Sequence, residues 1–78
     1  MIDEKLITWN QIKAARGLLG WKQVELAREA DLSAPTIKAA ENPEAKVSEL
    51  TLFKIRRAFE GKGIKFIETG VQLEGTAL

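Results

Sequence analysis

Apolar side chains recur at helical spacing between residues 9 and 60 and at every second position between residues 64 and 73. Spacings of three and four residues place side chains on one face of a helix, whereas a period of two is typical of a strand. We therefore expect an all-α domain of four to five helices, followed by a short C-terminal strand or hairpin around Thr69 and Gly70.

The first helix has clear start and stop signals. Thr8 is suited to cap it, and Gln11, three residues later, can reach back to the backbone of Thr8 in a capping box. The apolar spacing continues to about Leu19, and Gly20 is suited to the left-handed conformation that ends many helices. The sequence therefore predicts a helix over residues 9–19.

A break in an alanine-rich stretch separates two short helices in the middle of the chain. The first is predicted over residues 23–30, and Asp31 then lies where a positive φ is expected. Ser33 can cap the next helix, in whose first turn Pro35 is acceptable because an N–H there has no intrahelical partner. We expect this helix to extend to Glu41, so that a tight turn joins two helices at a fixed angle.

A fourth helix is predicted from the cap residue Ser48 to about Glu60, and Gly61 and Gly63 end it. Its inward face would carry Leu52, Ile55, Ala58 and Phe59. We expect residues 1–62 to form the helical domain and residues 63–78 to form a C-terminal β extension.

Composition excludes several classes of function. The 78 residues include no cysteine and no histidine, so the commonest nucleophile, general base and metal ligands are missing. We expect no enzymatic activity, no metal and no cofactor. No run of about 18 apolar residues is present, so we expect a cytoplasmic protein without a membrane partner. The net charge of +1 alone indicates no nucleic-acid partner.

Two motifs carry a resemblance to a known family. The pattern LGWKQxxLA at residues 19–27 and the pattern LSxxTIxxxE at residues 32–41 are similar to the helix-turn-helix of lambda-repressor-like, Cro/cI-type (Xre) transcriptional regulators. The similarity covers about residues 9–60. It implies a DNA-binding domain in which the second helix braces the third, residues 33–41, in the major groove.

The resemblance also implies which residues contact DNA. Gln23 would hold a phosphate and orient the third helix, while Lys22 and Lys46 would contact phosphates. The full implied set is Lys22, Gln23, Ser33, Ala34, Pro35, Thr36, Lys38, Ala39 and Lys46.

The third helix departs from the family at the positions expected to face DNA. Ala34, Pro35 and Ala39 offer only apolar contact to a thymine methyl group. Thr36 and Lys38 are the only outward side chains expected to form hydrogen bonds there. Specificity would then depend on DNA shape, or the module would have exchanged DNA for a protein partner.

An arginine on the first helix and a glutamate at the end of the third form an ion pair in the resembling family. Arg16 and Glu41 occupy the matching positions. The resemblance therefore implies that these two residues stabilise the motif and do not contact DNA.

We predict a sequence-specific regulator of double-stranded DNA, acting as a repressor and as a homodimer. The alternative is a protein-interaction module on the same fold, such as an antitoxin-like partner. An exposed strand edge invites pairing with another chain, although the extension could instead pack onto the fourth helix of its own chain. The expected dimerisation residues are Phe59, Ile64, Phe66, Ile67, Val71 and Leu73.

Overall fold

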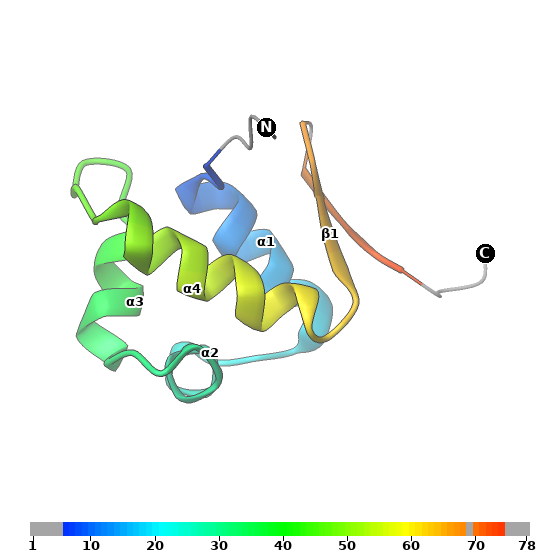
Figure 1. Ribbon diagram of the computed structural model, residues 1–78, viewed down its shortest axis with the longest axis horizontal. Coiled ribbons are helices and arrows are strands. Elements are labelled where there is room, and N and C mark those ends of the chain that lie inside the picture. Colours follow the sequence, from blue (N-terminus) through cyan, green and yellow to red (C-terminus); the bar gives the residue numbers. More distant parts are fainter. Residues whose placement is uncertain (1–5, 69, 75–78) are drawn as a thin grey trace.

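The computed structural model describes residues 6–68 and 70–74, and it confirms the predicted fold class: four helices are followed by a two-stranded antiparallel hairpin (Figure 1). The elements are α1 (Trp9–Leu19), α2 (Gln23–Ala30), α3 (Ala34–Ala40), α4 (Glu49–Glu60), β1 (Ile64–Ile67) and β2 (Gly70–Leu73). Within the described residues, no helix is long and apolar enough to cross a membrane.

The helix ends follow from their local chemistry. Thr8 caps α1: its hydroxyl accepts from the Gln11 N–H, and the Gln11 side chain accepts from the Thr8 N–H at 3.0 Å. Gly20 ends α1 with φ of 69°, and Asp31 ends α2 with φ of 58°. Both C-caps are therefore left-handed, as their residue types indicate.

Every helix contributes to one core. Five large side chains are completely buried: Phe59, Ile12, Leu26, Ile37 and Ile55. The Phe59 ring lies between two other rings, with its centroid 5.7 Å from that of Trp21 and 5.9 Å from that of Phe66. Because Trp21 precedes α2 and Phe66 belongs to β1, this stack joins the connection after α1, the fourth helix and the hairpin.

The hairpin packs onto the helices of its own chain. Its register pairs Ile64 with Leu73 and Phe66 with Val71, and β2 lies against α1 while β1 lies against α4. Ile64 is only 3% exposed, and Phe66, Val71 and Leu73 pack against the buried core. The sheet lies at the opposite end of the molecule from α3 (Figure 1).

This arrangement corrects the expected dimerisation surface. Phe59 is 0% exposed and Ile64 3%, so neither side chain offers a surface to a partner. The period of two correctly placed the apolar side chains on one face of the hairpin, but that face covers the core of the same chain. Of the six residues expected to form the interface, Ile67 alone is exposed, at 37%.

Gln11 connects the start of α1 to the turn of the hairpin. While its oxygen accepts from Thr8, its amide nitrogen donates to the carbonyl of Ile67 at 2.7 Å and to that of Gly70 at 3.1 Å. We expect Gln11→Ala to lower the free energy of unfolding by about 1–2 kcal/mol, because two hydrogen bonds to the hairpin and the side-chain hydrogen bond to the Thr8 N–H are lost. Chemical denaturation would measure this loss.

Gln11→Glu is a matched variant, since a glutamate at this position keeps the acceptor of the capping box but lacks the amide donor. We expect faster amide hydrogen exchange in β2 and unchanged exchange in α3. Unaltered exchange in β2 would show that Gln11 does not hold the hairpin.

Candidate nucleic-acid interface

α2 and α3 form a helix pair joined by a tight turn. After the left-handed residue Asp31, the N–H of Leu32 donates to the carbonyl of Ala27 at 2.9 Å, which closes the end of α2. Ala27 and Ala30 are buried, and these small side chains allow α3 to approach closely. The break in the alanine-rich sequence thus fixes the direction of α3 relative to α2.

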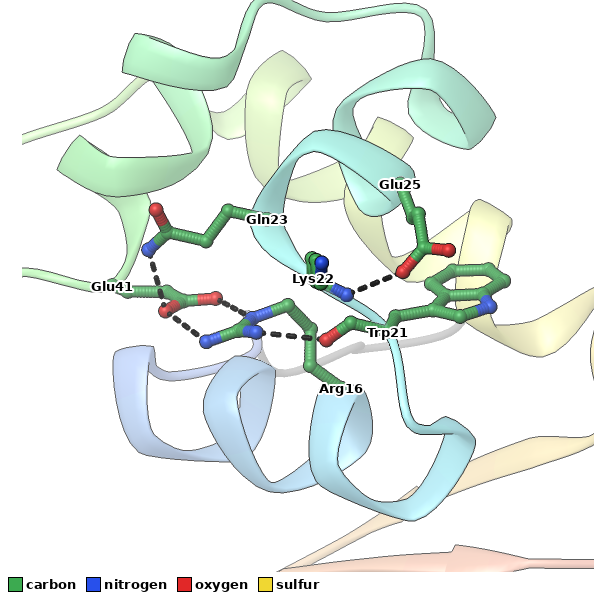
Figure 2. A network of polar contacts seen from close by, with 6 residues as sticks. All are labelled: Arg16, Trp21, Lys22, Gln23, Glu25 and Glu41. Carbon is green, nitrogen blue, oxygen red and sulfur yellow. Dashed lines mark hydrogen bonds and ion pairs between the residues drawn. The ribbon is translucent and has the colours of Figure 1, made fainter.

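A buried carboxylate fixes the other end of α3 (Figure 2). Glu41, the C-cap of α3, is 7% exposed. Its two oxygens accept from Arg16 of α1, from Nε at 2.6 Å and from Nη2 at 3.0 Å. Arg16 also donates from Nη1 to the carbonyl of Trp21 at 2.9 Å. Bidentate pairs of this kind are strong and directional, so α1, the α1–α2 connection and the end of α3 are held together.

Gln23, the first residue of α2, is the third partner of Glu41. Its Nε2 donates to Oε1 of Glu41 at 3.0 Å, so its side chain points towards the end of α3 (Figure 2). An amide nitrogen carries two hydrogens, and one of them is used in this contact. The second hydrogen is not used in this contact and can be donated to a phosphate oxygen.

The exposed face of α3 is narrower than expected. Pro35 and Lys38 are exposed and Ala39 is half-buried, and the exposed Asn42 follows the end of the helix. Ala34 packs against the core, because it lies three residues before the buried Ile37 and so on the same side of the helix. Ala34 is therefore half-buried and not fully outward, and its contact with DNA stays a prediction.

Thr36 is half-buried and takes part in the capping of α3. Its hydroxyl lies 2.8 Å from that of Ser33, and the Ser33 oxygen accepts from the Thr36 N–H at 3.3 Å. The contact between the hydroxyls uses only one of the two hydroxyl hydrogens. The sequence indicated two hydrogen-bonding side chains on the outer face of α3, Thr36 and Lys38. Of these two, Lys38 is the exposed one.

Three exposed lysines come from three parts of the chain. Lys22 precedes α2, Lys38 lies on α3, and Lys46 lies in the connection between α3 and α4. The Lys22 side chain makes no capping hydrogen bond; the Glu25 side chain accepts from the Lys22 N–H at 2.6 Å instead. This acidic side chain in the first turn of α2 reduces the attraction of that helix end for a phosphate.

Two residues of this region were not predicted from the sequence. Glu25 lies three residues after Lys22, which is the spacing of a capping box. Asn42 lies beyond the end of α3 at Ala40, and its side-chain oxygen accepts from the N–H of Glu44 at 2.9 Å. The spacing could have indicated the role of Glu25, and Asn42 adds an exposed amide just after α3.

The face formed by the exposed side of α3 and the three lysines offers positive charge and the shape of an exposed helix. Among residues 6–68 and 70–74, no group of three acidic side chains is placed to hold a metal ion. An exposed α-helix fits the major groove of B-DNA, which is about 12 Å wide. Lysines beside it can neutralise phosphates.

Comparison with known proteins also indicates a helix-turn-helix domain. No curated protein matches the chain. A family model described as helix-turn-helix matches residues 12–66, more than two-thirds of the chain, and this range contains α2, α3 and the complete Glu41 network. The chain belongs to the lambda-repressor-like (Xre) helix-turn-helix family of DNA-binding regulators.

Proposed function

We propose that this protein binds specific sites in double-stranded DNA and represses transcription, with α3 in the major groove. One observation carries the proposal: α3 is fixed at both ends, by the turn at Asp31 and by the Glu41 network, while Pro35 and Lys38 are exposed. A rigid helix with an exposed outer face is the arrangement that groove reading requires. Repression needs only that the bound protein occupies its site.

Few side chains on α3 can read bases directly. Lys38 can donate to the O6 and N7 atoms of guanine. Beyond the end of α3, the amide nitrogen of Asn42 can donate to a base, while its oxygen accepts from the N–H of Glu44. Pro35 and Ala39 can contact thymine methyl groups only. We therefore expect a short set of specified base pairs, with further selectivity from groove shape.

Phosphate contacts supply most of the affinity in this proposal. Lys22, Lys38 and Lys46 are exposed, so two copies of the chain on one site would neutralise about six phosphates. The logarithm of the binding constant should then fall against the logarithm of salt concentration with a slope of about −5. Fluorescence anisotropy with a labelled duplex between about 50 and 200 mM salt measures this slope.

Selection of bound sequences from random duplexes would test specificity before that titration. Enrichment of a defined site, with the expected salt slope, is the supporting result. An affinity that does not change with salt would contradict the proposed phosphate contacts.

A protein-interaction module is the second candidate, and the small number of hydrogen-bonding side chains on the exposed face of α3 favours it. Antitoxin-like partners belong to this class. A complete failure to enrich any duplex, by protein that is folded, would support this candidate over DNA binding.

A further inference from the structure

The outer face of α4 carries two large apolar side chains that the core does not use. The inner face of this helix holds the completely buried Ile55 and Phe59. On the outer face, Leu50 is 62% exposed and Phe53 is 52% exposed. Exposed apolar side chains that lie next to one another on a helix are a common mark of an interaction site.

Charged residues flank Phe53 symmetrically. Glu49 lies four residues before it and Arg57 four residues after it, and both are exposed. Residues four apart lie on one side of a helix, so Glu49, Phe53 and Arg57 form a single ridge. The Arg57 guanidinium lies 5.6 Å from the centre of the Phe53 ring, which keeps it at the surface of this ridge.

We propose that two copies of this chain associate through α4, antiparallel, about a two-fold axis at Phe53. About such an axis, a residue that lies a given number of positions before Phe53 in one copy faces the residue that lies the same number of positions after Phe53 in the partner. Glu49 of each copy then lies opposite the partner's Arg57, and this attraction occurs twice. A two-fold interface must be complementary to itself, and an acidic and a basic residue at equal distances from an aromatic residue meet this requirement.

A hollow beside Phe53 fits the same arrangement. It is a shallow depression, widely open to solvent, with a volume of about 320 Å³. Its lining is Glu29, Ala30 and Asp31 at the end of α2 and Phe53, Lys54, Arg57 and Ala58 of α4. Leu50 does not line the hollow; it lies one turn before Phe53 and four residues before Lys54, so on the same side of α4 as Lys54, which does line it. In the antiparallel dimer the partner's Leu50 lies one turn beyond Phe53, and so enters the hollow.

The ridge suits the packing of one helix on another. A two-fold axis at Phe53 lays this row against the same row of the partner, so the two Phe53 rings meet at the axis and the charged residues meet on either side of it. A stable interface buries about 800 Å² on each partner, about one-seventh of the 5468 Å² accessible surface of this chain. The outer face of α4 and the adjoining end of α2 are the surfaces from which this area would come.

This contact does not depend on DNA binding. The hollow adjoins Asp31, whereas the contact of Gln23 with Glu41 lies at the other end of α2. A second copy and DNA would therefore use different ends of this helix, and either could fail without the other.

The first experiment compares Phe53→Ser with Val24→Ser in the full chain. Val24 is 53% exposed and lies on α2, so it is a control of equal exposure. Sedimentation equilibrium between about 1 and 100 μM should show a dimer whose dissociation constant rises by about 30-fold or more in Phe53→Ser. Val24→Ser should dimerise like the unchanged chain. Circular dichroism would check that each variant is folded.

Charge reversal gives a sharper test. Glu49→Arg alone and Arg57→Glu alone each place like charges opposite one another twice, so each variant should be monomeric. An equimolar mixture of the two variants restores opposite charges at both contacts and should form a mixed dimer.

Three outcomes would overturn the proposal. They are an unchanged chain that is monomeric at 100 μM, a dimer that Phe53→Ser leaves intact, and reversed variants that do not associate when mixed.

Discussion

Arg16→Ala is expected to lower the free energy of unfolding by about 3 kcal/mol. Glu41 is 7% exposed, and without Arg16 this carboxylate would lose two of its three hydrogen bonds while remaining buried. The carbonyl of Trp21 would lose its donor as well. A loss of this size is a large share of the stability of a small domain, and urea denaturation followed by circular dichroism would measure it.

A double-mutant cycle with Glu41→Gln separates this pair from its surroundings. Removing the charge of Glu41 should recover part of the stability that Arg16→Ala loses, because no carboxylate is then left buried without its partner. Arg28→Ala, at an exposed position of α2, is the control and should change stability by less than about 0.5 kcal/mol. Fully stable Arg16→Ala protein that has lost only its DNA affinity would contradict the structural role of the pair.

Lys38→Glu is expected to weaken binding to a selected duplex by about 100-fold, or about 3 kcal/mol. The substitution removes a donor from the exposed face of α3 and places a negative charge beside the DNA. The side chain of Lys38 is exposed, so we expect the fold and the melting temperature to be retained. Fluorescence anisotropy at one fixed salt concentration would measure the affinity.

Lys65→Glu is the matched control, because it changes the net charge equally at an exposed position of β1, at the opposite end of the molecule from α3 (Figure 1). Only a small loss of affinity is expected for it. Equal losses in the two variants would mean that overall charge, and not α3, determines binding.

The helix boundaries could be predicted because they depend on neighbouring residues. Thr8 and Ser33 cap helices through hydrogen bonds to backbone groups three residues away. Gly20 and Asp31 occupy left-handed positions, which glycine permits because it has no Cβ and aspartate permits because its side chain is short and polar. Such effects are local, so one short stretch of sequence contains all the information that they require.

The inner and outer faces of α3 and of the hairpin were harder to predict, because they depend on residues far along the chain. Ala34 is half-buried by packing that a seven-residue helix does not reveal. The apolar residues of the hairpin could equally cover this chain or another one, and the core around Phe59 decides between the two. The outer face of α4 was missed for the same reason: Leu50 and Phe53 stand out only once the inner face is filled.

Gln11 has a consequence for the order in which the chain folds. Its hydrogen bonds to Ile67 and Gly70 connect residues 56 and 59 positions apart, which are among the most distant contacts that a chain of this length can form. Contacts so far apart form slowly, because a long loop must close first. During synthesis α1 emerges from the ribosome long before its partner strands. The turn between α2 and α3 can therefore form while the hairpin is still being made, and the domain closes only when Gly70 has emerged.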